Sequence, residues 1–281
     1  MASTRGLVVA PRFVWDGHTL SFPGLVGLAP SDLRRYALYW DRLDFPDNNL
    51  IGIASSPEVD YLATAGVLGR TRVVVRQSGN VGALYVLAQF EAFQQLSAKD
   101  PGLWTIGQSA ADFYAPREVS APSRGIEVEI YEALPTPPDN VALSDILEFK
   151  HRRVSELGAL RANLDDLYLE INKAGDIPRA KTAALDRLGQ TVADLNRVAN
   201  ETWPSRVMSS VKVELNIPDI AAKASAGLVI ALSVGVPGSV GAAIGAAAAS
   251  IKISINEMMA PRLPNGLRDF AYVYRQLNEL K

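Results

Sequence analysis

Arg12 and His18 have the spacing of a helical ribonuclease motif, the first pattern in the chain whose residue types could do chemistry. That chemistry needs both side chains on one helix. Asp16-Gly17 lies between them and predicts a hairpin, because both central positions of a tight two-residue turn require positive φ. We therefore expect His18 to be a turn residue and not a catalytic base.

A second pattern loosely matches metal-dependent nucleases, which place two carboxylates and a lysine around a metal ion on strands. Asp139 is followed by Glu148 and Lys150. Glu148 and Lys150 are two positions apart in a predicted helix, so their side chains should point apart. The basic run 150–153 could contact phosphates. Glu148 and Glu156 belong to the same predicted helix and favour a solvated, ion-paired face instead.

Three further patterns are each incomplete. Gly79–Gly82 precedes a predicted helix and could offer backbone N–H groups to an anion, but it lacks the lysine and hydroxyl of a phosphate loop. Ser109 lacks the second glycine of a nucleophile elbow. Glu127 and Glu129 are expected on the wet face of a strand. We therefore assign no catalytic, cofactor-binding or metal-ligating residue, expect no cofactor, and lean against an enzyme.

Composition excludes several classes of protein. The chain has 281 residues, 48% hydrophobic and 21% charged, which is ordinary for globular proteins. It has no cysteine and two histidines, which removes disulfides and thiolate sites and leaves too few ligands for a multi-histidine metal centre. The net charge of −2 gives no strong signal for nucleic acid. The apolar run Leu7–Ala10 is too short for a signal-peptide core, so we expect a cytoplasmic protein.

Residues 1–135 alternate short β-rich runs with helical patterns, which predicts an α/β region with a mixed sheet. The expected strands are Leu7–Ala10, the hairpin arms Arg12–Trp15 and Thr19–Phe22, Asn49–Ala54, Arg72–Val75 and Gly125–Leu134. The expected helices run from a Ser31 cap to about Leu43, from Ser56-Pro57 to about Leu68, and over Val81–Ser97.

Helices dominate the predicted structure after the proline-rich stretch 134–139. Apolar stripes over Ser144 to about Lys173 and over Leu185–Val198 predict a long antiparallel helical hairpin within residues 140–205. Residues 206–281 should contain a strand at Val207–Ile217, a hydrophobic helical hairpin at 219–256 and an amphipathic helix at Leu267–Leu280. We expect the three regions to fold as one cooperative unit.

The most unusual segment is 224–251, which has 28 residues and no charge; 18 of them are Ala, Gly or Ser. Such small residues let helix backbones approach closely. Pro237-Gly238 splits the segment into halves that are each too short to span a bilayer. Four interpretations stay open: a hairpin buried in a soluble fold, a hairpin that inserts into a membrane after a trigger, a constitutive anchor, and an interface between copies. The glycines expected at the oligomer or membrane contact are Gly227, Gly235, Gly238, Gly241 and Gly245.

Three stretches resemble an uncharacterised bacterial family that is catalogued only as a domain of unknown function. They are Leu38–Leu43 with Glu58–Leu62 and Gly66–Leu68, Ile146–Arg153 running into Glu156–Leu164, and Arg268–Tyr274. The resemblance covers most of the chain and supplies no catalytic residues. It implies a bacterial intracellular protein and leans toward accessory genes such as defence or toxin-like loci.

These observations predict a non-enzymatic bacterial interaction or effector protein. Its partner would be another copy or another protein, with the glycine/alanine-rich hairpin mediating oligomerisation or conditional membrane insertion. Such a protein would be cytoplasmic and in part membrane-associated. One alternative is an enzyme or ligand-binding domain with a site at the carboxyl ends of the strands in 1–135. The other is a structural subunit.

Overall fold

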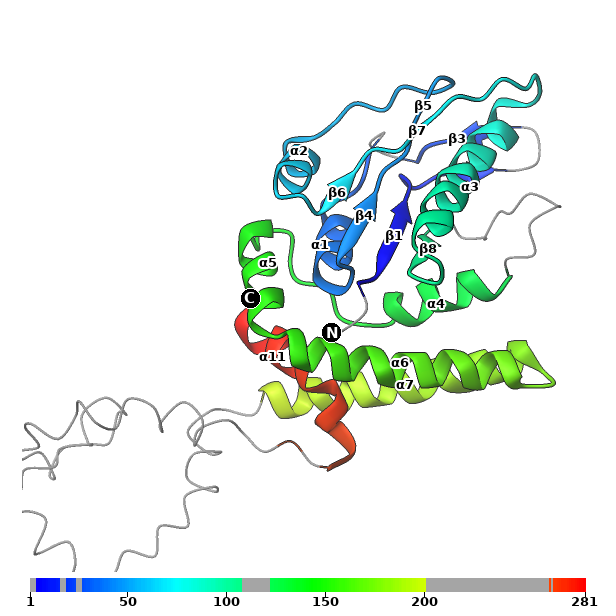
Figure 1. Cartoon of the computed structure of the whole chain (residues 1–281). Helices are drawn as coiled ribbons and strands as arrows, with labels where there is room; N and C mark the ends of the chain where they lie inside the picture. The colour runs from blue at the N-terminus through cyan, green and yellow to red at the C-terminus, as the bar shows by residue number, and fades with distance from the viewer. Residues whose placement is uncertain (1–3, 16–18, 24–26, 108–121, 201–262, 264) are drawn as a thin grey trace, which may run out of the picture. The chain divides into compact units, whose positions relative to one another are not determined.

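The computed structural model of the chain describes residues 4–15, 19–23, 27–107, 122–200, 263 and 265–281 (Figure 1). It confirms the α/β class. The strands are β1 (Gly6–Val9), β2 (Val14–Trp15), β3 (Leu20–Ser21), β4 (Arg42–Asp44), β5 (Asp47–Asn48), β6 (Leu68–Gly69), β7 (Arg72–Val73) and β8 (Trp104–Gly107). The helices are α1 (Pro30–Tyr39), α2 (Pro57–Thr64), α3 (Val81–Lys99), α4 (Pro122–Glu132), α5 (Leu143–Arg152), α6 (Val154–Lys173), α7 (Ile177–Asn200), the 3₁₀ helix η2 (Asn265–Phe270) and α11 (Ala271–Glu279).

A four-stranded sheet in the order β6-β4-β1-β8 lies at the centre of the fold, and every pair in it is parallel. In chain order these are the third, second, first and fourth strands. The direction of the crossovers therefore reverses between β1 and β8, which makes this position the topological switch point of the sheet. All four residues of β1 are buried, as expected for the predicted apolar strand at its centre.

Helices cover both faces of the sheet. Crossovers are right-handed in nearly all proteins, so α1 and α3, whose crossovers run in opposite directions along the sheet, lie on opposite faces. On the α3 face, Tyr85 and Phe90 pack with Val8 and Ile106. Trp104 lies directly over Gly6, where an added Cβ would come 2.4 Å from the Trp104 Cε3 atom, so the close packing of β1 with β8 requires glycine.

The antiparallel pair β2–β3 forms a separate two-stranded ribbon and does not extend the sheet. Its pairing confirms the predicted hairpin. The register joins Trp15 to Leu20, which leaves four residues between them instead of the two expected at Asp16-Gly17. The parallel pair β5–β7 likewise forms its own ribbon, beyond β4 and β6 along the chain.

The predicted long helix over 144–173 is interrupted at Arg153, which has φ −118° and ψ 29° and separates α5 from α6. Residues 174–176 then connect α6 to α7. The two helices lie side by side in Figure 1, and the Arg187 guanidinium lies 2.7 Å from the Glu170 carboxylate. The predicted C-terminal helix docks on the body as expected, because the buried Tyr272 hydroxyl donates a 2.8 Å hydrogen bond to the Leu38 carbonyl.

The strand expected at Gly125–Leu134 is wrong, because these residues belong to α4 and the residues that follow it. Ile126, Val128, Ile130 and Tyr131 are all buried. Ile126, Val128 and Ile130 alternate with glutamates, which is the pattern of a strand with one exposed face. α4 instead contacts β8 on one side and α6 on another, so its apolar residues occupy more than one stripe.

Several predicted boundaries also shift. The first helix begins at Pro30 with Ala29 as its N-cap and ends at Tyr39, so Ser31 is not the cap and residues 42–44 form β4. The helix that opens at Pro57 ends at Thr64, followed by Gly66 at φ +72°. No strand is assigned at 49–54, which lies among the described residues. The strand predicted at Val207–Ile217 and the hairpin at 219–256 lie outside the described residues.

Candidate functional site

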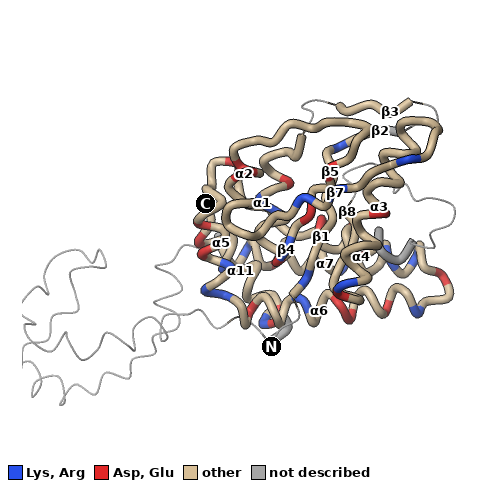
Figure 2. Tube along the Cα trace, turned by 45° about the horizontal axis from the view of Figure 1, so that its top comes forward, with Lys and Arg blue, Asp and Glu red and all other residues tan. Residues whose placement is uncertain are grey.

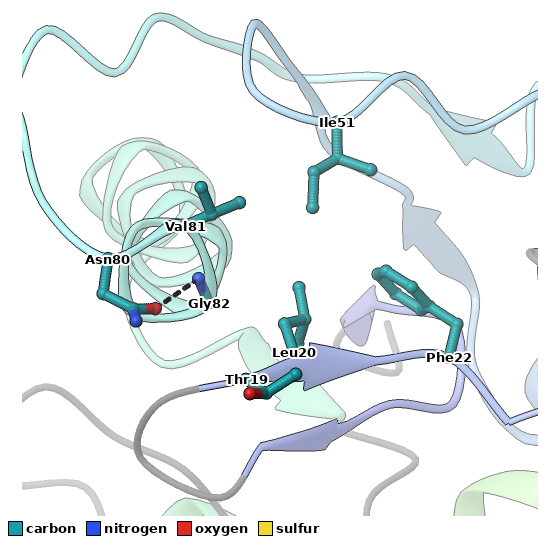
Figure 3. Close-up of a pocket in the computed structure, with 7 residues that line it drawn as sticks. All are labelled: Thr19, Leu20, Phe22, Ile51, Asn80, Val81 and Gly82. Carbon is teal, nitrogen blue, oxygen red and sulfur yellow. Dashed lines mark hydrogen bonds between the residues drawn. The ribbon is translucent and has the colours of Figure 1, made fainter.

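A surface depression of about 300 Å³ lies beside the elements that follow the carboxyl ends of the strands (Figure 3). Its walls come from β3, from the chain after β5 and from the first turn of α3. Figure 3 shows Leu20, Phe22 and Ile51 directed into the space between these elements. The residues that line the depression are Thr19, Leu20, Phe22, Ile51, Asn80, Val81 and Gly82.

The described lining of the depression is mostly apolar. None of the described lining residues carries an ionisable side chain, and their polar groups are the Thr19 hydroxyl, the Asn80 amide and the backbone. Phe22 packs edge-on against Tyr85 with ring centroids 5.6 Å apart, so the floor of the depression continues into the hydrophobic core. Burial raises the pKa of Tyr85, which keeps its phenol protonated.

The N-termini of α1, α2 and α3, which begin at this edge of the sheet, each carry a polar or acidic side chain from the same segment of the chain. Asn80 accepts hydrogen bonds from the backbone N–H groups of Gly82 at 2.8 Å and Ala83 at 3.4 Å. Ser56 caps α2 by accepting from the Val59 N–H at 3.3 Å. The α1 N-terminus holds Asp32 in its first turn. Asn80 and Ser56 thus bind backbone N–H groups that a helix N-terminus could otherwise offer to a phosphate.

Asp32 is also held by Arg12, which follows β1 at the switch point. The Arg12 guanidinium donates two hydrogen bonds to the Asp32 carboxylate, at 3.0 and 3.2 Å. The side chain of Asp32 is 5% exposed and that of Arg12 is 55% exposed. Hydrogen bonding and the charge of Asp32 raise the pKa of Arg12. The pair fixes the chain after β1 to the start of α1.

Charged side chains gather at the opposite, amino end of the strands, in what we call the amino-edge cluster: Arg5, Asp41, Lys150, Arg161 and Asp165. Arg161 donates to the Asp41 carboxylate at 2.8 Å and to the Tyr39 carbonyl at 2.7 Å. The Arg5 backbone N–H also donates to Asp41, at 2.8 Å, while its guanidinium pairs with Asp165. Lys150 donates to the carbonyls of Ala37 at 2.7 Å and Trp40 at 2.6 Å, at the C-terminal end of α1.

Burial and pairing shift the titration of this cluster. Burial alone would raise the pKa of Asp41, but the hydrogen bond and charge of Arg161, with further help from Arg5, lower it. Burial lowers the pKa of Lys150 to about 8, against the attraction of Asp41. Burial raises the pKa of the neighbouring Tyr131 to about 12. Each of these cations already donates to protein acceptors, so the cluster joins α1 to α5 and α6 and stabilises the body.

A family model matches residues 19–281, almost the whole chain. The chain belongs to the family of unknown function DUF6236. This confirms the resemblance found in the sequence. No curated protein and no solved structure matches the chain.

In this DUF6236 chain the nuclease-like residues Glu148 and Lys150 make separate contacts. Of the ribonuclease-like pair, Arg12 binds Asp32, and His18 lies outside the described residues. Glu148 lies 3.5 Å from Arg152 on the outside of α5, whereas Lys150 contacts the carbonyls of α1. Among the described residues, no group of three His, Cys, Asp or Glu side chains could hold a metal ion.

The remaining acidic candidates take part in ion pairs that join α4 to other elements. Glu127 and Glu129 lie on α4; Glu127 is 3.9 Å from Arg5, and Glu129 is 2.8 Å from Lys181 of α7. In the basic run, Arg152 lies 3.5 Å from Glu148 and Arg153 lies 3.6 Å from Glu156, as predicted for an ion-paired face. Arg153 also pairs with Glu279 of α11 at 2.7 Å. Lys150 departs from that prediction because its amine is directed inward.

Sequence reasoning missed the amino-edge cluster, although a signal for it exists. Arg161 lies between Leu160 and Leu164 on the predicted buried stripe of its helix, and Lys150 lies four residues after the buried Ile146. A charge on a buried stripe requires a partner. The missed depression left no comparable signal, because its walls come from three separate segments.

The five glycines assigned to an oligomer or membrane contact, Ser109 and the start of the loop after β8 all lie outside the described residues. Within the part of the chain that the structure describes, none of the helices has both the length and the hydropathy needed to cross a bilayer.

Proposed function

We propose that this protein is a non-enzymatic bacterial interaction protein that assembles through an inserted segment. The body would position residues 219–256, and these would contact a second copy or, after a trigger, a membrane. A role as a defence or toxin-like effector is part of this proposal on the strength of the family resemblance alone.

The observation that carries the proposal is the way the chain leaves and re-enters the body. Residues 1–199 and 265–281 form one compact unit, so residues 200–264 are an insertion in the sequence of that unit. The C-terminal helix that follows the insertion is anchored to the body. Tyr272 is fully buried and packs against Phe149 with ring centroids 5.1 Å apart, and Glu279 pairs with Arg153. An insertion whose two ends are anchored can change its contacts while the body stays folded.

The composition of the insertion supports self-association. Gly241 and Gly245 form a GxxxG pair in a stretch of 28 residues without a charge. Glycines at this spacing allow close contact between helix backbones, and the absence of charge makes exposure to water costly. The mostly apolar residues described in the lining of the depression are also compatible with binding.

The decisive experiment replaces residues 219–256 with a Gly/Ser linker of equal length, which behaves as a flexible coil. We expect the linker variant to be a monomer whose body melts at the same temperature as in the wild type. The wild type should have a larger mass in light scattering, or leave a carbonate-resistant membrane fraction that the variant lacks. Equal mass and equal membrane retention in both proteins would overturn the proposal.

A point variant localises the contact. Gly241→Leu with Gly245→Leu should abolish assembly, because the added side chains separate the helix backbones. The matched control is Ala243→Leu with Ala247→Leu, which places the same side chains at the same spacing but about 200° around a helix. Equal effects of the two double variants on assembly would contradict a contact through these glycines.

Ligand binding by residues 1–135 is the second candidate, and the topological switch point between β1 and β8 favours it, because open α/β sheets bind ligands at such points. A nucleotide or small anion that raises the melting temperature of the linker variant would support this function. The side-chain caps at the starts of α2 and α3 weigh against a phosphate ligand.

A further inference from the structure

The parallel ribbon β5–β7 has one edge that no described residue covers with hydrogen bonds. On the inner edge, the Asp47 N–H donates to the Thr71 carbonyl at 2.9 Å. The Asn49 side chain continues the ladder, accepting from the Val75 N–H at 2.8 Å and donating to the Val75 carbonyl at 3.1 Å. Backbone groups alternate sides along a parallel strand. Since Thr71 and Val75 face β5, the N–H and carbonyl of Arg72 and Val74 point to the outer edge.

The side chains of the same stretch also divide into two faces. Val73 is 2% exposed and packs with Ala88 and Ala92 of α3, with Val75 beside it. Arg72, Val74 and Arg76 alternate with these residues and lie on the opposite face, where all three are exposed and Val74 is 54% exposed. A row of arginine, valine and arginine thus borders an unpaired strand edge.

Positive charge is concentrated along this edge. Figure 2 shows basic positions on the β5–β7 ribbon. The Arg70 guanidinium lies over the Phe45 ring at 4.4 Å and 3.9 Å from the Asp47 carboxylate. Within the described part of the chain, Arg72 and Arg76 have no carboxylate within ion-pair distance. Their charges are therefore available to a partner.

We propose that the outer edge of β7 binds an extended acidic peptide of another protein, which adds a strand to the ribbon. The main chain of the peptide would pair with Arg72 and Val74, the usual source of affinity in strand addition. Its side chains would set specificity: acidic residues four positions apart beside Arg72 and Arg76, and an apolar residue between them beside Val74. This pattern reads the same in both directions, so it suits a parallel or an antiparallel peptide.

Pairing of this edge with a second copy is disfavoured by charge. Two β7 edges placed side by side would bring arginines of both copies together, and like charges across a strand pair destabilise it. Exposed basic residues on edge strands are a common way to prevent such self-pairing. The same arginines attract a negatively charged strand.

The charge test uses a fluorescein-labelled peptide with the central sequence Glu-Thr-Val-Thr-Glu, and a control peptide in which lysine replaces glutamate. We expect the acidic peptide to bind the full chain in fluorescence anisotropy, and Arg72→Glu with Arg76→Glu to weaken it at least about tenfold. The lysine peptide should bind the reversed variant better than the wild type. A wild type that binds both peptides equally would overturn the proposal.

The backbone test compares Val74→Pro with Val74→Ala. Proline removes one N–H at the outer edge and leaves the inner ladder intact, a position that strands tolerate. Alanine shortens the side chain and keeps the N–H. Val74→Pro should bind the acidic peptide at least about tenfold more weakly than Val74→Ala, with equal melting temperatures. Equal binding would overturn strand addition, as would a dimer in light scattering that Val74→Pro alone dissociates, because a second copy would then occupy the edge.

Discussion

The two ends of the central sheet differ in chemistry. At the amino end, five charged side chains form short hydrogen bonds with one another and with the last carbonyls of α1. At the carboxyl end, the described residues that line the depression are uncharged, and the depression is open to solvent. The first end joins the residues before β1, the end of α1 and the consecutive helices α5 and α6, whereas the second leaves space between three segments.

This difference in chemistry predicts different contributions of the two ends to stability. Removing a partner from the amino-edge cluster leaves a buried charge uncompensated, which costs several kcal/mol. A change in the described lining of the depression leaves no charge without a partner. We therefore expect the loss of a polar group to cost more stability at the amino end than at the carboxyl end.

Arg161→Met gives the largest expected effect. It removes the partner of the Asp41 carboxylate and of the Tyr39 carbonyl while keeping the apolar length of the side chain. We expect the free energy of unfolding to fall by about 3 kcal/mol, as for other broken buried pairs. Urea unfolding measures this directly.

The matched control is Arg187→Met on α7, whose ion pair with Glu170 has both side chains more than half exposed. Exposed pairs contribute about 0–1 kcal/mol. If Arg161→Met destabilised the protein no more than Arg187→Met, the amino-edge cluster would not be the stabilising end of the sheet.

The sequence correctly predicted the elements whose apolar residues form a single run or a single stripe. β1 is an uninterrupted apolar run, α3 has an Asn cap and a long apolar pattern, and the C-terminal helix carries a clear stripe. α4 was mistaken for a strand because it has two buried sides. Its alternating glutamates are ion-paired with Arg5 and Lys181, which the sequence does not bring near them.

β4 was missed because partners distant in the sequence satisfy its polar residues. Arg42 pairs with Asp100, 58 residues away, and lies 5.0 Å from the Trp104 ring centroid. Asp44 accepts hydrogen bonds from the Thr71 N–H and hydroxyl, 27 residues away. Burial raises the pKa of Asp44 against these hydrogen bonds. A short strand with two charged residues out of three is recognisable only once these contacts are known.

Lys150 makes the amino edge sensitive to pH. Its folded pKa of about 8 lies below the value of about 10.4 for a free lysine, so between these values the unfolded chain binds more protons than the folded one. Stability must then rise with pH in that window, by at most about 1.4 kcal/mol per pH unit. Lys150→Met should remove this contribution, which urea unfolding at pH 7.5 to 9.5 measures.

The window ends where the tyrosines begin to ionise in the unfolded chain, near pH 10. The buried Tyr131 and Tyr272 have raised pKa values, so above that pH they oppose the effect of Lys150. Lys173→Met is the control, since Lys173 is exposed at the end of α6. Equal slopes for the wild type and Lys150→Met would show that the Lys150 amine is not the titrating group.

Asn80→Ala is the smallest of these changes and tests the other end of the sheet. It removes the side-chain acceptor for the Gly82 and Ala83 N–H groups at the edge of the depression. Loss of such a cap costs about 1 kcal/mol. It also frees two N–H donors beside Val81. Asn80→Asp keeps the acceptor and adds a negative charge that the helix dipole favours, so its free energy of unfolding should equal or exceed that of the wild type.

If the alanine variant binds phosphate or sulfate in calorimetry and the aspartate variant does not, the cap is what keeps anions from the carboxyl end. If the alanine variant unfolds with a loss as large as that of Arg161→Met, the two ends of the sheet do not differ in their contribution to stability.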